Sequence, residues 1–190
     1  MEDYRTLLGQ GTGEYEEKHS RFIGLAQFAD TEEKALAVLN SVRAGNRTRY
    51  SDDGEPAKTA GLPVLEAIRH AGLTDCVVVV TRYFGGILLG TGGLVRAYTQ
   101  AAKLALEAAP SGTMRVCVRL TVTVEYPLYE RADLLLRTAG AHMEEPEFTH
   151  QVTLRCVLPQ GEEAPLIPKL QEWSRGAAAI EVSPGFYTAF

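Results

Sequence analysis

Near the middle of this chain of 190 residues, a glycine-rich run joins an apolar segment to a long helical pattern, which favours a strand, a turn and a helix in that order. The preceding residues 75–81 are continuously apolar and β-branched, which predicts a central strand covered on both faces. Residues 93–109 carry apolar side chains at helical spacing and predict a long helix. The run between them contains five glycines within nine residues: Gly85, Gly86, Gly90, Gly92 and Gly93.

The residues before this run predict a domain with both helices and strands. Residues 15–28 are typical of a strand or hairpin, and a capping pattern opens a helix over 31–44. Apolar periodicity then vanishes over residues 45–61, a loop of about 17 residues, and loops of that length in compact domains are usually functional or disordered. A short helix over 63–70 leads to the apolar strand.

A domain boundary is predicted at Pro110-Ser111-Gly112, which divides the chain into residues 1–112 and 113–190. Apolar and polar residues alternate beyond it over 114–124, as in a long half-buried strand. The remaining pattern predicts a helix over 127–139, strands over 141–148 and 151–158, a helix over 165–175 and a strand over 178–188. This βαββαβ order is ferredoxin-like, so the predicted fold class is α+β with two domains.

The distribution of charge limits which partners the chain can hold. It carries 19 basic and 24 acidic residues, and a net charge of −5 excludes nucleic-acid binding by a dominant positive field. Residues 1–115 hold 13 basic and 14 acidic residues, whereas residues 116–190 hold 6 and 10. Any RNA binding is therefore expected to be local and to involve the N-terminal domain.

Neither a membrane nor a disulfide framework is expected. The chain has no run of about 18 apolar residues and its start lacks the pattern of a signal peptide, so we expect a cytoplasmic protein without a membrane partner. Its three cysteines, Cys76, Cys117 and Cys156, are predicted to be reduced thiols. Cys156 falls on an apolar strand face, whereas Cys117 falls on a polar face beside Arg115 and Arg119, which would lower the pKa of its thiol.

The glycine-rich run has two interpretations. In the steric one, the glycines allow positive φ angles and close backbone contacts, while the flanking arginines pair with the acidic residues of the long loop. In the functional one, backbone amides and arginines accept an anion, and two aromatic rings stack on a base or an apolar partner. The candidate RNA- or anion-binding residues are Arg82, Tyr83, Phe84, Gly85, Gly86, Gly90, Gly92, Gly93 and Arg96.

The long loop contributes an acidic group formed by Asp52, Asp53 and Glu55. These carboxylates could hold Mg²⁺ or act as acid and base, but Asp-Gly is also a strong turn signal and no further ligand has suitable spacing. The glycine-rich run matches neither the P-loop nor the dinucleotide fingerprint. We therefore assign no catalytic residue, no metal site and no cofactor, and we favour a non-enzymatic function.

Four segments together closely resemble the IMPACT family, in its bacterial YigZ-like branch: Ser51–Pro56, Thr59–Pro63, Val79–Gly86 and Leu89–Tyr98. The resemblance covers essentially the whole chain. It implies an N-terminal domain similar to the second domain of a small-subunit ribosomal protein and to the fourth domain of the translocating elongation factor. It also implies a ferredoxin-like C-terminal domain similar to the fifth domain of that factor, and a role in regulating translation.

Three functions follow as hypotheses. The preferred one is a translation-associated protein that contacts RNA, the ribosome or a ribosome-bound factor through the glycine-rich run, helped by the basic residues Arg43, Arg47 and Arg49. The alternative is a small enzyme or binding protein for a phosphorylated or nucleotide ligand, which would use the same run and the acidic loop. The third is a partner or dimer surface on the second domain, with the oligomeric state open between monomer and homodimer.

Overall fold

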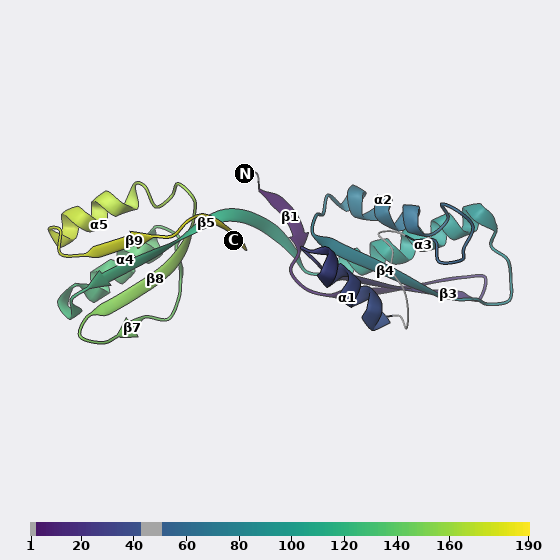
Figure 1. Cartoon of the computed structure of the whole chain (residues 1–190), viewed down its shortest axis with the longest axis horizontal. Helices are drawn as coiled ribbons and strands as arrows, with labels where there is room; N and C mark the ends of the chain where they lie inside the picture. The colour runs from purple at the N-terminus through teal and green to yellow at the C-terminus, as the bar shows by residue number, and fades with distance from the viewer. Residues whose placement is uncertain (1–2, 43–50) are drawn as a thin grey trace. The chain divides into compact units, whose positions relative to one another are not determined.

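A computed structural model describes residues 3–42 and 51–190 of the chain. It contains two compact units, Tyr4–Thr113 and Met114–Phe190, the second of which also includes Asp3. Both units mix helices with antiparallel strands, so the predicted α+β class is confirmed (Figure 1). No helix within the described residues is long and apolar enough to cross a lipid bilayer.

The first unit is built on a small antiparallel sheet with the strand order β2-β3-β4. Residues 15–28, predicted as a strand or a hairpin, belong to a hairpin, because β2 and β3 pair directly around a short turn. Strand β1 pairs with β5 (Ser111–Val124), whose first residues belong to this unit. Besides the start of β5, the elements of the unit in chain order are β1 (Tyr4–Leu7), β2 (Gly11–Glu17), β3 (Ser20–Phe28), α1 (Glu32–Val42), α2 (Gly61–Ala71), β4 (Cys76–Tyr83) and α3 (Gly90–Ala108).

Helix α3 lies unusually close to this sheet. Gly13 and Gly24 face each other across the β2–β3 pair. A Cβ atom at Gly13 would lie 2.5 Å from the backbone nitrogen of Ala105, and one at Gly24 would lie 2.5 Å from the carbonyl oxygen of Ala101. The helix meets these glycines with alanines that are fully buried. Glycine on the strands and alanine on the helix thus set the distance between the two layers.

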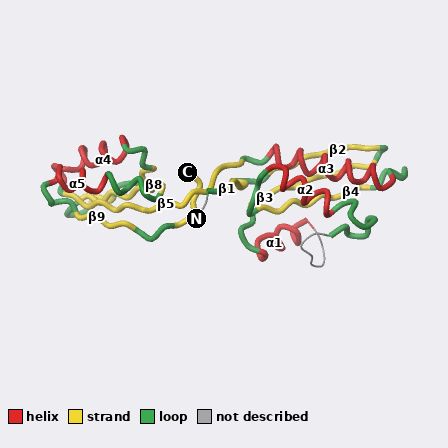
Figure 2. The backbone as a smooth tube through the Cα atoms, turned by 90° about the horizontal axis from the view of Figure 1, so that it is seen from above, coloured by secondary structure: helices red, strands yellow, loops and turns green. Residues whose placement is uncertain are grey.

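Helices α2 and α3 pack together and enclose the core of the unit with the sheet (Figure 2). Helix α1 contacts β4. The prediction that residues 75–81 form a central strand is wrong, because β4 pairs only with β3 among the described residues and lies at the edge of the sheet. The apolar side chains of β4 pack against helices rather than beside a second neighbouring strand. A continuous apolar run in the sequence is expected in either case, so it does not show whether a strand is central or at an edge.

The second unit has the predicted ferredoxin-like βαββαβ topology. Its sheet is antiparallel, with β9 and β10 on one side of β5, and β8 followed by β6 and β7 on the other. The long predicted strands over 141–148 and 178–188 are each divided into two short ones. The remaining elements are η1 (Tyr126–Leu128), α4 (Tyr129–Thr138), β6 (His142–Met143), β7 (Glu147–Phe148), β8 (Val152–Pro159), α5 (Leu166–Ser174), β9 (Ala179–Val182) and β10 (Phe186–Ala189).

The cysteines of this unit are both buried. Cys156 lies in the core between the sheet and the helices, as its strand face predicts, and burial raises the pKa of its thiol to about 11. The expectation for Cys117 is wrong, since its side chain is fully buried and burial raises the pKa of its thiol despite the nearby Arg115. Strands pair with β5 on both sides of Cys117, with Phe186 of β10 opposite it on one side and Pro159 of β8 on the other.

Candidate functional site

The site is organised around Arg82, near the end of β4, whose side chain is only 13% exposed. One terminal nitrogen of its guanidinium lies 2.5 Å from a carboxylate oxygen of Glu55, and the other donates to the Ser20 hydroxyl at 3.4 Å. The guanidinium carbon also lies 5.5 Å from the ring centroid of Phe22 and 5.2 Å from that of Phe84. Arg82 is therefore enclosed by its own domain, which favours the steric interpretation for this arginine.

Glu55 connects the acidic loop to helix α3 as well as to β4. The Tyr98 hydroxyl donates to the same carboxylate oxygen at 3.1 Å, and the Tyr98 ring meets Phe22 edge-on at a centroid distance of 5.1 Å. Burial, followed by the negative charge of Glu55, raises the pKa of Tyr98, so its hydroxyl keeps its proton. The partners of Glu55 come from a strand and a helix, and together they fix the position of the loop.

Asp52 caps helix α2 from eight residues before the N-cap position, Ala60. One oxygen of its carboxylate accepts hydrogen bonds from the backbone amides of Ala60 and Gly61, both at 2.9 Å, and the other accepts from the amide of Lys58 at 2.8 Å. The bonds from Ala60 and Lys58 lower the pKa of Asp52 below its ordinary value of 3.8. The carboxylate thus satisfies backbone donors that would otherwise be left without partners at the start of the helix.

Replacing this cap gives a pH-dependent prediction. Because the pKa of Asp52 is lower in the folded state, its carboxylate contributes fully at neutral pH, and the contribution is lost as pH falls from 3.8 through the folded-state pKa. At pH 7 we expect Asp52→Asn to be about 1 kcal/mol less stable than the wild type, because the amide nitrogen of asparagine cannot accept the bond from the Lys58 amide. The gap should shrink at pH 3, as measured by urea denaturation at both values. An equal gap at both values would contradict the role of the carboxylate.

The glycine-rich run is anchored to the β2–β3 turn through Gly85. Its backbone amide donates to the Ser20 hydroxyl at 3.1 Å. A Cβ atom at Gly85 would lie 2.0 Å from the carbonyl carbon of His19, so no larger residue fits there without moving the turn. Gly86 and Gly90 have φ angles of +83° and +71°, which L side chains rarely adopt. The steric interpretation of the glycines therefore applies at these three positions.

The last glycines of the run belong to helix α3. This helix begins at Gly90, three residues before the predicted start, so Gly92 and Gly93 lie in its first turn. The N-cap residue, Leu89, forms no capping hydrogen bond through its side chain. The first turn carries a partial positive charge from its backbone amides, and its residues Gly90, Thr91 and Gly92 are exposed.

The most exposed part of the run is apolar. We call Tyr83, Phe84, Ile87 and Leu88 the apolar tip; Tyr83 and Phe84 are each 59% exposed and Leu88 is 83% exposed. Arg96 is exposed on α3 and, among the described residues, it forms no ion pair. Large apolar side chains with this exposure at one turn are typical of an interaction surface.

The predicted site residues thus divide into two groups. The structure brings Arg82 and Glu55 together in a structural ion pair, while Arg96 and the aromatic residues remain accessible. No group of three or more potential metal ligands occurs among residues 3–42 and 51–190. Arg43, Arg47 and Arg49 lie outside the described residues.

Two residues of the network were not found by sequence reasoning. The Ser20 hydroxyl accepts hydrogen bonds from Arg82 and from the Gly85 amide, and the Tyr98 hydroxyl donates one to Glu55. Tyr98 did carry a signal, because a tyrosine on the buried stripe of a helix needs a partner for its hydroxyl.

Comparison with known proteins places this arrangement in a family. Residues 18–106 match the Impact N-terminal domain, and residues 122–177 match a domain of unknown function, DUF1949. A Thermus thermophilus protein described as an IMPACT family member is 39% identical over 177 residues, covering 86% of this chain and 98% of the relative. The chain belongs to the IMPACT family.

Other IMPACT relatives give the same pattern. The Escherichia coli IMPACT family member YigZ is 34% identical over 182 residues, covering 86% of this chain and 89% of the relative. A solved crystal structure of a hypothetical protein matches with a TM-score of 0.59 and 33% identity, covering 95% of this chain and 97% of that chain. The predicted membership of the IMPACT family is therefore confirmed, and it extends over both units.

Proposed function

We propose that this IMPACT-family protein is a cytoplasmic, non-enzymatic, translation-associated protein that contacts ribosomal RNA through its apolar tip. The observation that carries the proposal is the exposure of Tyr83 and Phe84, 59% each, immediately before the glycine-rich run that leads into the exposed first turn of α3. Exposed aromatic rings are the usual platform for unpaired bases, because every base has a face that stacks, and Arg96 on α3 is an exposed cation that can meet a phosphate.

The buried network beneath the tip supports this role. The Ser20 hydroxyl accepts from the Gly85 amide and from Arg82, which in turn pairs with Glu55, so the start of the glycine-rich run and the aromatic rings before it are held by this network. Holding the rings in place reduces the entropy that binding would otherwise cost. In this proposal Arg82 is a positioning residue, whereas Tyr83, Phe84 and Arg96 make the contact.

The acidic loop has a structural part in the proposal. The carboxylates of Asp52 and Glu55 already accept hydrogen bonds from the backbone and from Arg82 and Tyr98. A ligand-bound Mg²⁺ would have to displace these partners, which favours RNA contact over the nucleotide-binding alternative.

Co-sedimentation with ribosomes tests the proposal. We expect the double variant Tyr83→Ala/Arg96→Ala to bind at least about tenfold more weakly, because a stacked base and a phosphate contact are both lost. The dependence of its binding constant on salt should also become less steep, by about one unit of logarithmic slope.

A matched control comes from the second unit. Tyr126 is 52% exposed and Arg131 is exposed, so Tyr126→Ala/Arg131→Ala removes the same two kinds of side chain from another surface. This control should bind ribosomes as the wild type does. Equal binding of the two double variants at low salt would contradict RNA contact at the tip.

A further inference from the structure

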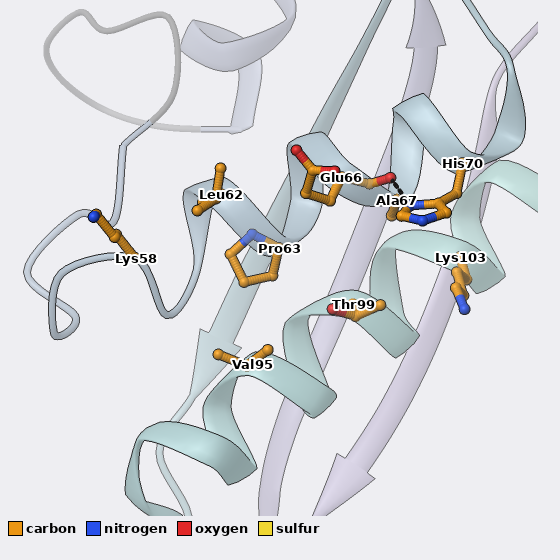
Figure 3. A pocket seen from close by; sticks show the side chains of 9 residues that line it. All are labelled: Lys58, Leu62, Pro63, Glu66, Ala67, His70, Val95, Thr99 and Lys103. Atoms are coloured by element: carbon orange, nitrogen blue, oxygen red, sulfur yellow. Dashed lines mark hydrogen bonds between the residues drawn. The ribbon is translucent and has the colours of Figure 1, made fainter.

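A groove runs between helices α2 and α3, on a surface that the proposed RNA contact does not use. Its volume is about 380 Å³, and it is open to solvent. Figure 3 shows residues from both helices along its length, with Lys58 at one end and with His70 and Lys103 at the other.

The floor of the groove is apolar. Pro63 and Ala67 come from α2, and Val95 on α3 lies across from them near the Lys58 end (Figure 3). Ala67 is only 3% exposed and has only a methyl group as its side chain, which does not fill the space above it, whereas Val95 is 37% exposed. Small residues on the two helices therefore leave a shallow channel that an apolar side chain can enter.

The rim of the groove is basic. Lys58 and Lys103 are both exposed and form no ion pair with another described residue. The acidic residue of the rim, Glu66, is paired with Arg69 at 2.7 Å. His70 donates from Nδ1 to the backbone oxygen of Glu66 at 2.7 Å, which leaves Nε2 for another partner. Among the described residues, neither lysine is therefore neutralised by a salt bridge.

The distribution of charge in the unit makes this surface distinct. Five of its acidic residues lie on other elements, with Glu14, Glu16 and Glu17 on β2 and with Glu32 and Glu33 in the first turn of α1, whereas Glu66 lines the groove and Glu107 follows Lys103 by one turn of α3. The lining itself holds two lysines and one glutamate, so it has a net positive charge on a unit whose overall charge is close to zero.

We propose that the α2–α3 groove binds an acidic amphipathic segment of a partner protein. Eight residues separate Val95 from Lys103, which corresponds to about 12 Å along a helix. About two turns of a bound helix span that length, with apolar side chains on the floor and a carboxylate near each lysine. Complementary charge selects an acidic segment, and the apolar floor selects a peptide rather than a chain of phosphates.

Peptide binding to the full-length chain tests this proposal. The probe is a fluorescein-labelled helical peptide of twelve residues with leucine at positions i and i+4 and glutamate on both sides. We expect saturable binding, measured by fluorescence anisotropy, and a loss of at least about tenfold in Lys58→Glu/Lys103→Glu. The same peptide with lysine in place of glutamate should not bind.

The control variant is Lys18→Glu/Lys169→Glu, which has the same change in net charge at exposed lysines outside the groove. It should bind the acidic peptide as the wild type does. Absence of saturation up to ~1 mM peptide, or equal loss in both double variants, would overturn the proposal. Displacement of the bound peptide by a polyuridylate oligonucleotide in the wild type and in Tyr83→Ala/Arg96→Ala would also overturn it, because the groove would then hold RNA.

Discussion

Gly24→Ala is expected to destabilise the N-terminal unit by about 3 kcal/mol, at the upper end of what overpacking commonly costs. The added methyl group would lie 2.5 Å from the carbonyl oxygen of Ala101 and 3.0 Å from the Cβ atom of Ala105. The first of these atoms belongs to the helix backbone, which cannot rotate away as a side chain can. Relief of the clash requires α3 to separate from the sheet, and the separation would disturb the whole helix–sheet interface.

Urea denaturation with two probes measures this effect. Trp173 is the only tryptophan of the chain and packs against the core of the second unit, so its fluorescence reports on that unit. Hydrogen exchange of α3 reports on the first unit. We expect the midpoint of the α3 transition to fall in Gly24→Ala while the Trp173 transition stays near its wild-type position.

Gly92→Ala provides the matched control for this substitution. Gly92 lies in the first turn of α3 itself. The nearest atom to a Cβ added there would be a guanidinium nitrogen of Arg96, at 3.7 Å, so the added methyl group has room. Alanine has a higher helix propensity than glycine, so this variant should be as stable as the wild type or more stable by up to about 1 kcal/mol. Similar losses in the two variants would show that close packing at Gly24 does not set the stability.

The sequence predicted the class and order of elements better than their environment. The alternation of residues 114–124 identified a half-buried strand because the period of two survives in an antiparallel sheet with one covered face. The continuous apolar run of β4 did not reveal an edge strand, because contacts with helices favour the same residues as strand neighbours do. The first turn of α3 was also missed, since glycine has low helix propensity.

Prediction of the site was limited by the path of the acidic loop. The sequence offered Asp52, Asp53 and Glu55 as partners for the flanking arginines, and the structure pairs Glu55 with Arg82. Asp52 instead caps α2, a role that depends on a loop returning to a helix eight residues later. No local pattern encodes such a return, so the choice between a pairing and a capping carboxylate required the fold.

Arg82→Ala is expected to destabilise the first unit by about 3 kcal/mol, because removal of one partner from a largely buried ion pair leaves the other charge without compensation. The side chains of Arg82 and Glu55 are 13% and 18% exposed. Among the described residues, the Tyr98 hydroxyl alone would remain as a hydrogen-bond partner of the Glu55 carboxylate. The α3 hydrogen-exchange transition again measures the loss, and an unchanged transition would contradict the structural role of the pair.

Arg82→Met/Glu55→Leu is the informative partner of this variant. Apolar replacement of both members of a buried pair is often nearly neutral, and here it also removes Nε of Arg82, a buried donor without a hydrogen-bond partner among the described residues. We therefore expect the double variant to recover part of the stability lost in Arg82→Ala, the remainder being the cost of the Tyr98 hydroxyl, which loses Glu55 as its acceptor. Recovery in Arg82→Ala/Glu55→Leu to the same degree would show that the uncompensated charge, rather than lost packing around the guanidinium, dominates the cost.

The same pair of variants separates positioning from contact at the tip. If Arg82 only holds the glycine-rich run, ribosome binding should be weak in Arg82→Ala and should return with stability in Arg82→Met/Glu55→Leu. If the guanidinium itself contacts RNA, the stable double variant should still bind weakly, and its salt dependence should be less steep by about one unit. Because the guanidinium lies between Phe22 and Phe84 and is 13% exposed as a side chain, we expect the first result.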